Sequence, residues 1–575
     1  MTAGQPFWRT ILAVCAAIIV VLWLAQANPY LNPADDSGRY MVLGESLAQT
    51  GDLRLINDVR HLRDTLYVPG FPLLIACWLK ATGSAPGAVV LPVKATLLIL
   101  QLGTLPLFLV LLQRARLRQT TIVCAMFAYA LCPAMVAYSN EVMSEMLLLF
   151  LCLASIVLAT RPLAPSSGAR TQIPNLEGTD AAPRPAGDSP PAPNAAGAEE
   201  PPDPTPEPRP PTFSAPPAVY LAGALVCACL AYYVRAAGAI LLLSLIVWFC
   251  YKRQWLWGTI GLVMALLVVG TWQLRTSRII ASDPPNTPHD TYMKQFTLKN
   301  PDDPNAGRIQ MNALGIASRI KRCFPPNIGN IPRAVLFSMG APKSIWQYLF
   351  FVVAVPFTLL ALAGLALAWR KQLYLICGFS ALFWVFIALW PWLNPRFLVP
   401  LIPYILLYVF IAAEALYDAV KPNMPDVAIR TIFGVYLALM FLYYARVYSV
   451  VIPREHRGAL TGYSLGRTKD EAGFYAAANW LRGREPDTVV MARPTYLMHL
   501  YSGHPTTQIE PSMNAKAQEL AYMLPNHVRY LVADKWSWSH TDRYVGNYLS
   551  IYGKEWTLVW TDPLGSGVTI YRRNL

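Results

Sequence analysis

The stretch Asn32-Pro33-Ala34-Asp35-Asp36-Ser37-Gly38-Arg39-Tyr40 follows directly on the first long apolar run of the chain. Two adjacent carboxylates, an arginine and a tyrosine therefore stand where a membrane-spanning helix would reach water. An Asp at the start of a helix often serves only as a cap, because its side chain accepts hydrogen bonds from the first backbone N–H groups. An outward-facing carboxylate pair can also act as a general base or hold a metal ion. The spacing of Asp35 and Asp36 leaves both interpretations open.

The sequence around this stretch has the composition of a membrane protein. Of its 575 residues, 55% are hydrophobic and 14% are charged, whereas soluble domains carry about 25% charged residues. Apolar runs of ~17–25 residues recur, which is the length that a helix needs to cross ~30 Å of hydrocarbon. We predict a polytopic α-helical membrane protein with about eleven transmembrane helices. The predicted spans are residues 8–27, 89–112, 121–138, 143–159, 218–233, 236–251, 256–274, 345–369, 373–390, 397–416 and 432–450.

Basic residues between the runs predict the orientation. Cytoplasmic loops retain Lys and Arg, and in this topology every tight basic cluster lies on one side, with Asp35, Asp36, Glu141 and Glu145 on the other. The N-terminus is then cytoplasmic, as expected for a multi-pass protein of a bacterial inner (plasma) membrane. The net charge of +14 forms no continuous basic stripe, which argues against nucleic-acid binding. The basic clusters are Arg114/Arg116/Arg118, Arg161, Lys252/Arg253, Arg370/Lys371 and Lys421/Arg430.

Three segments interrupt the pattern of spans. The apolar stretch 66–79 is short and contains Pro and Gly, which favours an interfacial helix on the outer face. Residues 161–217 are rich in Pro, Ala, Gly and acidic residues and predict a disordered cytoplasmic loop. Residues 276–343 predict a long outer loop, and a loop of this length over a membrane site suggests a lid.

The chain becomes soluble in character after residue 452. Short apolar runs alternate with helical patterns, which predicts a small extracytoplasmic α/β domain over residues 453–575 beside a membrane domain over residues 1–452. It contains no Gly-rich phosphate loop, so we interpret it as an accessory domain. Helices are predicted at 469–482 and 515–523, and strands at 488–492, 528–533, 556–560 and 567–572.

A second acidic turn, Tyr138-Ser139-Asn140-Glu141-Val142-Met143-Ser144-Glu145, joins the third and fourth runs. Glu145 would begin the fourth span, where an ionisable side chain is costly and is by default a functional candidate. The alternative is that Ser144 and Glu145 only cap the helix N-terminus. We therefore take Glu145 as a candidate catalytic residue together with Asp35 and Asp36.

Outer-face cations are candidates for binding a phosphate, because Arg makes bidentate contacts with phosphate oxygens. The alternative for each is snorkelling towards lipid headgroups. The candidate phosphate-binding residues are Arg63, Lys94, Arg235 and Arg396. The candidate substrate-positioning residues are Arg39, Tyr40, Tyr67, Glu141 and Tyr404.

The sequence requires no cofactor. Most of the ten cysteines lie in apolar runs, where Cys behaves as a small hydrophobe. His61, His289, His499 and His504 lack the spacing of zinc ligands. A divalent metal ion at the outer carboxylates is compatible with the sequence, which does not identify its ligands.

Five short pieces of sequence occur in an order typical of one enzyme family. They are Asp35-Asp36-x-x-Arg39-Tyr40, Leu66-Tyr-Val-Pro-Gly-Phe-Pro-Leu-Leu74, Ser-Asn-Glu-Val-Met-Ser-Glu145, Val234-Arg235-Ala-Ala-Gly238 and Arg396-Phe-Leu-Val-Pro400. Over about residues 8–450 the chain resembles the GT-C class of polyprenyl-phosphate-sugar-dependent membrane glycosyltransferases. The relatives include the bacterial protein O-mannosyltransferase and aminoarabinose transferase families. Two departures are Asp36, where Glu is usual, and Thr65-Leu66, where a Lys is expected, which makes Arg63 a substitute candidate for the phosphate.

The resemblance implies a hexosyl- or pentosyltransferase that moves a sugar from a polyprenyl-phosphate donor to an extracytoplasmic acceptor, which is a cell-envelope glycan, lipid or protein. It implies that Asp35 or Asp36 is the general base, that Glu145 is a second acid, and that Arg235 and Arg396 meet the lipid phosphate. The implied reaction is a direct displacement that inverts the anomeric centre. Two alternatives remain, namely a membrane transporter or flippase and a non-catalytic subunit of an envelope assembly complex.

Overall fold

The structure is a computed structural model, and it describes most of the chain. The described residues are 5–31, 36–58, 60–160, 217–284, 289–298, 309, 312–337, 345–460, 468–486, 488–508, 528–534, 545–546, 549–550 and 552–574. Asp35, the helix expected at 515–523 and the loop expected at 161–217 (apart from Pro217) lie outside the described residues.

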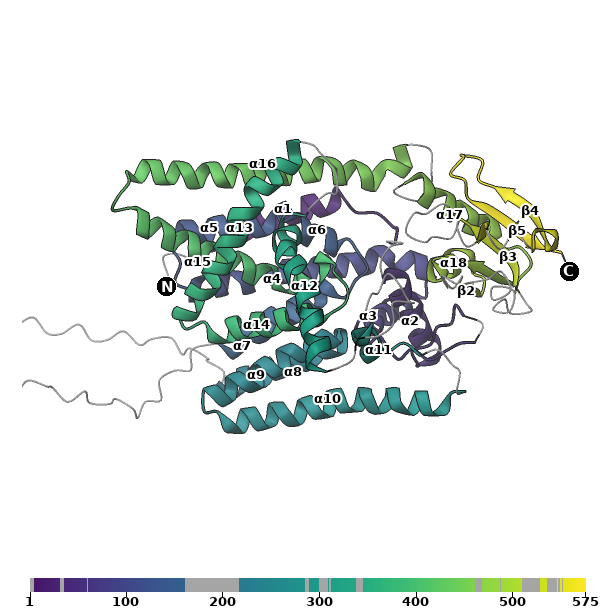
Figure 1. Cartoon of the computed structure of the whole chain (residues 1–575), viewed down its shortest axis with the longest axis horizontal. Helices are drawn as coiled ribbons and strands as arrows, with labels where there is room; N and C mark the ends of the chain where they lie inside the picture. The colour runs from purple at the N-terminus through teal and green to yellow at the C-terminus, as the bar shows by residue number, and fades with distance from the viewer. Residues whose placement is uncertain are drawn as a thin grey trace, which may run out of the picture.

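Long helices form an elongated bundle, with the sheet at one end of it (Figure 1). Among sequential neighbours, α7 packs on α8 and α9 on α10, whereas α13 packs on α15 and α4 on α7. The helices of the bundle are α1 (Gln5–Leu24), α4 (Val90–Arg114), α5 (Gln119–Ala130), α6 (Pro133–Ser139), α7 (Glu145–Ala159), α8 (Pro217–Val234), α9 (Ala239–Tyr251), α10 (Trp255–Ser282), α13 (Ile345–Arg370), α14 (Tyr374–Leu389), α15 (Ile402–Val420) and α16 (Asp426–Leu460). Short 3-10 helices η1 (Pro86–Val89), η2 (Ala236–Gly238) and η4 (Pro395–Leu401) precede α4, α9 and α15.

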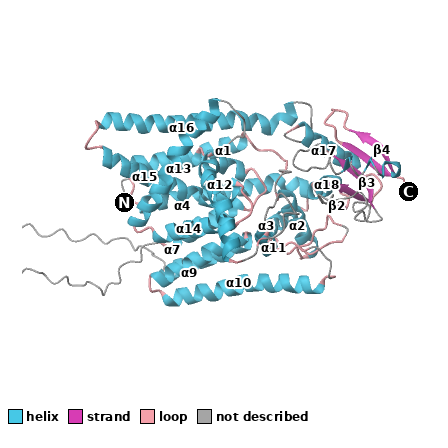
Figure 2. Ribbon diagram, viewed as in Figure 1, coloured by secondary structure: helices cyan, strands magenta, loops and turns pink. Residues whose placement is uncertain are grey.

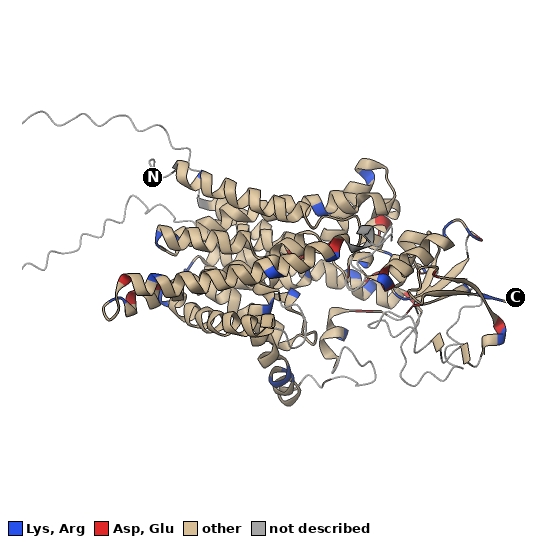
Figure 3. Ribbon diagram, turned by 90° about the horizontal axis from the view of Figure 1, so that it is seen from above, with Lys and Arg blue, Asp and Glu red and all other residues tan. Residues whose placement is uncertain are grey.

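Each predicted span coincides with a helix, but the helices differ in length. Among the described residues, 6 helices are long and apolar enough to cross a membrane, or 7 if the bent pair α5–α6 is one span. The other four predicted spans are α7, α8, α9 and α14, which are shorter apolar helices. The stretches between the two ends of the bundle are mostly uncharged (Figure 3). A multi-pass membrane protein is therefore supported, while the count of eleven stays a prediction.

The core of the bundle is built around α15. In the apolar stretch that includes α15, 83% of the residues are buried, whereas the share is 17% in the peripheral helices α1 and α10. The close packing of α15 on α13 depends on Gly364, where an added Cβ would lie 1.8 Å from the backbone oxygen of Tyr408. Small residues allow this close approach of helix backbones in membrane proteins. The core thus fixes the frame on which the ends of the helices are held.

Shorter helices cover the end of the bundle nearest the sheet. They are α2 (Ser37–Thr50), α3 (Gly70–Thr82) and α11 (Tyr292–Thr297). The longer helix α12 (Ala313–Leu336) packs on α13 and α14 within the bundle (Figure 1). Helix α2 packs against α3, where a Cβ at Gly44 would meet the side chain of Ile75 at 2.5 Å. This end of the bundle brings α2 close to the N-terminal end of α7 and to η4, as the contacts below establish.

A five-stranded mixed sheet follows the last long helix, beside α17 (Lys469–Leu481) and α18 (Thr495–Ser502) (Figure 2). The strand order is β2-β1-β3-β5-β4, with parallel pairing in β2-β1-β3 and antiparallel pairing in β3-β5-β4. The strands are β1 (Val489–Ala492), β2 (Thr506–Gln508), β3 (Val528–Ala533), β4 (Trp556–Thr561) and β5 (Thr569–Arg573). Strands therefore occur at all four predicted stretches, and the independence of this region as a domain stays a prediction.

Two predicted segments contain helix that extends beyond the predictions, and their roles as outer loop and domain boundary stay predictions. Within residues 276–343, α10 continues to Ser282 and α12 is a 24-residue helix. The C-terminal half of α12 is largely buried and packs on α6, α14 and η4. Helix α16 does not end near residue 452 but runs through Pro453 to Leu460.

Candidate active site

Asp36 lies at the start of α2 and forms an ion pair with Arg396. Arg396 Nη2 is 2.9 Å from Asp36 Oδ2, and the Tyr67 hydroxyl also hydrogen-bonds to this carboxylate. Asp36 occupies the N-cap position of α2, yet its side chain makes no capping hydrogen bond. The interpretation of Asp36 as a mere helix cap is therefore not supported, since its carboxylate is engaged by a cation from η4.

Glu145 forms a second ion pair, with Arg235, at the N-terminal end of α7. The Glu145 side chain is 1% exposed and Arg235 Nη1 contacts its Oε1, with Ser144 Oγ a further acceptor for the same nitrogen at 3.3 Å. Ser144 Oγ also hydrogen-bonds to the hydroxyl of Tyr40, at 3.0 Å. Ser144 makes no capping hydrogen bond. Glu145 is thus a buried charge that is matched by the arginine of the α8–α9 turn.

The two ion pairs are neighbours. The guanidinium carbons of Arg235 and Arg396 lie 5.3 Å and 5.2 Å from the centre of the same ring, that of Phe397. The charge of Arg235 also acts on Asp36. The rings of Tyr40 and Tyr67 pack edge-to-face, with their centres 4.8 Å apart. Since Tyr40 bonds to Ser144 and Tyr67 to Asp36, this ring contact links the two ion pairs. Two carboxylates and two arginines therefore form one cluster, to which α2, α7, η4 and the turn after α8 contribute.

Burial and charge oppose each other at Asp36. Burial raises the pKa of its carboxyl, whereas Arg396, the Tyr67 hydrogen bond, Arg235 and Arg39 lower it, and the balance leaves the pKa below its usual value. Burial and the Asp36 charge raise the pKa of Tyr67 well above its usual range, so the phenol stays protonated and can donate to Asp36. At neutral pH the Asp36 carboxylate is therefore ionised, as needed to accept a proton or to balance a developing positive charge.

Arg39 lies beside this cluster but pairs with a different carboxylate. Its Nη2 is 3.1 Å from Asp64 Oδ2, and Asp64 Oδ1 accepts from the backbone N–H groups of Leu66 and Tyr67. The Arg39 guanidinium stacks over Tyr67 at 4.8 Å and faces Tyr496 of α18 at 5.9 Å. Arg39 thus holds the loop that carries Tyr67 and connects it to the C-terminal region.

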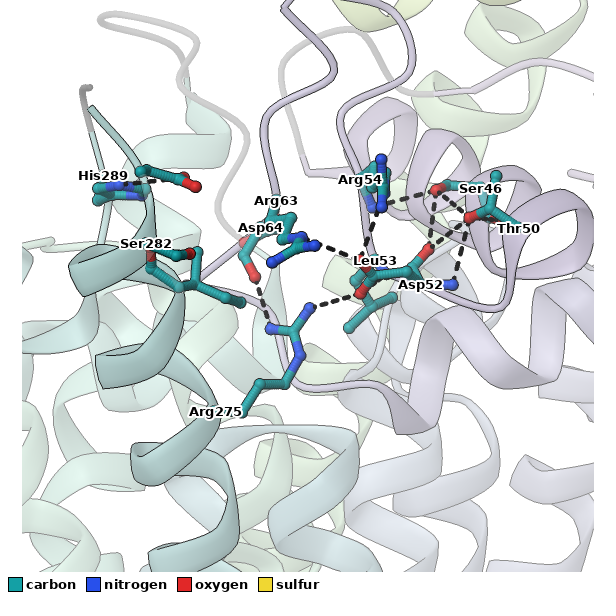
Figure 4. Close-up of polar contacts among 12 residues, drawn as sticks. Ser46, Thr50, Asp52, Leu53, Arg54, Arg63, Asp64, Arg275, Ser282 and His289 are labelled. Atoms are coloured by element: carbon teal, nitrogen blue, oxygen red, sulfur yellow. Dashed lines mark hydrogen bonds and ion pairs between the residues drawn. The ribbon is translucent and has the colours of Figure 1, made fainter.

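Arg63 belongs to a separate network around Asp52 (Figure 4). Arg63 Nε is 3.4 Å from Asp52 Oδ2, and Arg275 Nη2 of α10 is 3.0 Å from Asp52 Oδ1. Arg275 also donates to the backbone oxygen of Asp64, at 2.8 Å. This network fastens residues 52–64 to α10, and among the described residues Arg63 forms no ion pair with Asp36 or Glu145.

Lys94 of α4 is directed towards the chain between α1 and α2. It is fully buried, and its Nζ donates to Asn28 O (3.0 Å), Asn28 Oδ1 (2.9 Å) and Tyr30 O (2.7 Å). An ammonium group has three donors, so these three oxygens match its full donor capacity. The prediction that Lys94 binds a phosphate gains no support from these contacts.

Two predicted positioning residues lie elsewhere. Tyr404 is buried in α15, where its ring lies 5.6 Å from the ring of Phe379. Cys152, Tyr408 and Tyr129 are also near it, inside the bundle. Glu141 is half-buried in the turn before α7, where its backbone oxygen accepts from Met143 N. Asp35 lies outside the described residues. The structure therefore brings together Asp36, Glu145, Arg235, Arg396, Arg39, Tyr40 and Tyr67 of the predicted set.

Three residues of the site were not predicted. They are Asp64, which pairs with Arg39, and Tyr292 and Tyr496, which come from α11 and α18. Burial raises the pKa of Tyr292 to about 12, in a position where Arg235 and Asp36 are its charged neighbours. The Asp64-Thr-Leu-Tyr67 spacing beside the Pro-Gly-Phe-Pro segment was the only local signal for any of them.

No cluster of metal ligands is present among the described residues, where no group of three or more His, Cys, Asp or Glu side chains is close enough to hold an ion. Asp36 and Glu145 are each matched by an arginine instead. Metal dependence therefore stays a question for experiment.

Comparison with solved structures shows that the fold of the chain is similar to that of GT-C polyprenyl-phosphate-sugar glycosyltransferases. ArnT from Cupriavidus metallidurans, solved in the apo state and bound to undecaprenyl phosphate, superimposes with a TM-score of 0.53 at 13% identity, over 99% of this chain and 98% of that one. The archaeal oligosaccharyltransferase AglB from Archaeoglobus fulgidus, in complex with an inhibitory peptide and a dolichol-phosphate, gives a TM-score of 0.51 at 12% identity, over 100% and 75%. No protein-family model and no curated protein matches the chain. At these identities the likeness is one of fold.

Proposed function

We propose that this protein transfers a sugar from a polyprenyl-phosphate donor to an extracytoplasmic acceptor. The observation that carries the proposal is the paired cluster of Asp36–Arg396 and Glu145–Arg235 at one end of the apolar bundle. ArnT bound to undecaprenyl phosphate and AglB in complex with a dolichol-phosphate have the same fold. A lipid-linked donor would place its phosphate at such an end, with its chain along the apolar helices.

The arginines fit the role of phosphate ligands. Arg235 and Arg396 flank one phenylalanine ring, so a phosphate between them could receive hydrogen bonds from both. Each arginine now balances a carboxylate, and a phosphate that engages the arginines would leave Asp36 and Glu145 less restrained by them. A donor phosphate therefore prepares the carboxylates for the reaction at the same time as it is bound.

The proposed reaction is a single displacement at the anomeric carbon. The acceptor hydroxyl loses its proton to the Asp36 carboxylate, and its oxygen forms the new bond to the anomeric carbon. The bond from this carbon to the phosphate oxygen breaks, and the polyprenyl phosphate leaves with the electron pair, stabilised by Arg235 and Arg396. Attack from the face opposite the leaving group inverts the configuration. Asp35 is an alternative base in the same loop.

This proposal includes the predicted topology. Eleven spans, with the four shorter helices counted as spans, put the acidic cluster and the C-terminal region outside and the basic turns of the opposite end in the cytoplasm. The acceptor is a cell-envelope glycan, lipid or protein, and the membrane is the bacterial plasma membrane. In this arrangement α12 and the C-terminal region flank the acceptor side of the cluster.

The test is to measure release of polyprenyl phosphate by the purified full-length protein from a panel of polyprenyl-phosphate hexoses and pentoses. We expect one donor to be consumed, with Glu145→Gln slowing release about 10²-fold or more, as for loss of a group that acts in the transition state. Measurements with and without EDTA decide metal dependence. A folded protein that consumes no donor, or a Glu145→Gln variant as active as the wild type, would favour the transporter or assembly-subunit alternative.

A further inference from the structure

A cavity with a basic lining lies at the end of the bundle opposite the acidic cluster. Its volume is about 730 Å³. Its lining residues come from three turns and from two helix ends. The turns are α4–α5, α9–α10 and α13–α14, and the helix ends are the C-terminal end of α7 and the N-terminal end of α8. Figure 1 shows these turns on the side away from the sheet. The basic lining residues are Arg114, Arg116, Lys252, Arg370 and Lys371.

The charge of this basic cavity has little internal compensation. No acidic side chain lines it in the described part of the chain. Arg116, Lys252 and Arg370 form no ion pair with a described carboxylate, whereas Arg118, at the same end but outside the cavity, pairs with Asp418. Lys371 donates only to the backbone oxygen of Ala115, at 3.3 Å. The cavity is therefore a concentration of positive charge with donors to spare for an anion.

The backbone of the turns is conformationally costly where it enters the cavity. Arg116 and Gln372 have φ values of 53° and 62°, in the left-handed region that favours glycine. A residue with a side chain is strained in this region, and such residues gather at ligand-binding sites. The chain thus has long polar side chains at two positions whose backbone conformation glycine would adopt with less strain.

Aromatic residues fix the level of the cavity in the bilayer. Trp248 contacts Tyr251 at 5.9 Å, Tyr251 contacts Tyr374 at 5.5 Å, and Tyr374 contacts Trp369 at 4.9 Å, so that one aromatic row follows its rim. The Lys252 ammonium lies over the Trp248 ring at 4.7 Å. Trp and Tyr are enriched at the headgroup level of membranes. The basic cavity therefore lies where lipid phosphates are found.

We propose that this cavity binds the phosphate headgroup of an anionic membrane lipid. Basic pockets between helices at a membrane surface recognise such headgroups, and each Lys or Arg near the surface adds to the attraction. Arg116, Arg370 and Lys371 contact the phosphate, and the aromatic row borders the glycerol and the first methylenes. The site is distinct from the acidic cluster and does not depend on the proposed transfer reaction.

The test is native mass spectrometry of the full-length protein, titrated with cardiolipin, phosphatidylglycerol or phosphatidylcholine. The variants are the double substitution Arg370→Gln/Lys371→Gln and the single Arg116→Gly, with Arg118→Gln as the matched control. Arg116→Gly also removes the backbone cost, so its melting temperature should stay the same or rise while binding weakens. We expect the double variant to lose on the order of tenfold in affinity for the anionic lipids, and the control to be unchanged.

Four results would overturn the proposal. Equal loss in Arg118→Gln and in the double variant would show general attraction of basic loops to anionic lipid. Equal affinity for phosphatidylcholine, whose headgroup has no net charge, would show that the negative charge of the anionic lipids does not contribute to binding. Displacement of the lipid by millimolar inorganic phosphate would identify a site for soluble phosphate instead. A lower melting temperature in the double variant, with lipid affinity retained, would assign these side chains to stability.

Discussion

At the scale of single residues, the site is governed by competition between burial and nearby charge. Burial alone would raise the pKa of Asp36 and favour its neutral form, which could not accept a proton. The charge of Arg396 and the hydrogen bond from Tyr67 lower the pKa of Asp36 and outweigh the effect of burial. Glu145 is even more buried, and Arg235 is its matching cation. Each carboxylate is therefore kept available by a side chain from a different helix.

Removal of Arg396 should move the acid limb of activity to higher pH. The pKa of Asp36 in the folded protein lies below its usual value of about 3.9, so function that needs the carboxylate is present above this range and is lost as pH falls through it. In Arg396→Gln the carboxylate loses its main lowering interaction, so burial raises the pKa of Asp36 relative to that in the wild type. The measurement is the pH dependence of kcat/KM for wild type and variant. An unchanged acid limb with reduced activity would assign Arg396 to substrate binding alone.

Replacement of Lys94 should affect stability rather than donor binding. Lys94→Met leaves Asn28 O, Asn28 Oδ1 and Tyr30 O without their buried donor, and each unsatisfied group costs about 1–3 kcal/mol. We expect a lower melting temperature in detergent and an unchanged donor KM for the protein that remains folded. A raised KM at an unchanged melting temperature would restore Lys94 as a phosphate ligand.

At the scale of helices, close packing inside the bundle sets the positions of the ends that carry the site. Arg396 and Phe397 lie on η4, which continues directly into α15, and α15 packs against α13. A shift of α15 along α13 would move Arg396 relative to Asp36. The approach of these two helices therefore bears on the geometry of the first ion pair.

The contact between α13 and α15 predicts a steep cost for a single methyl group. A Cβ at Gly364 would lie 1.8 Å from the backbone oxygen of Tyr408, whereas a Cβ at Gly270 of α10 meets nothing within 4 Å. We expect Gly364→Ala to destabilise the protein by more than about 2 kcal/mol and Gly270→Ala to be neutral or slightly stabilising. Thermal unfolding of both variants in the same detergent makes the comparison. Equal melting temperatures would show that the helices separate without cost.

At the scale of the whole molecule, the C-terminal region is joined to the bundle next to the site. The Tyr475 hydroxyl of α17 donates to Leu31 O at 3.0 Å. The Thr506 side chain of β2 contacts Asn57 O at 3.3 Å. Tyr496 of α18 faces Arg39. The C-terminal region is thus placed to influence which acceptor reaches the cluster.

Local sequence was sufficient for the helices and for part of the site. Apolar runs predicted the bundle helices because length and hydropathy are local properties. Asp36, Glu145, Arg235 and Arg396 could be predicted because each is a charge at the end of an apolar run. Tyr292 and Tyr496 could not, since packing between distant segments brings them to the cluster. The contacts of Lys94 could not be predicted for the same reason, because its oxygen partners are 64–66 residues away.

The central claim is that the cluster around Asp36 is an active site for transfer from a lipid-linked sugar. The most direct measurement compares wild type, Asp36→Asn and the surface control Arg118→Gln for release of polyprenyl phosphate from the donor that the wild type consumes. We predict loss of about 10²-fold or more in Asp36→Asn, with an unchanged melting temperature and full activity in Arg118→Gln. A folded Asp36→Asn variant that releases polyprenyl phosphate at the wild-type rate would contradict the account.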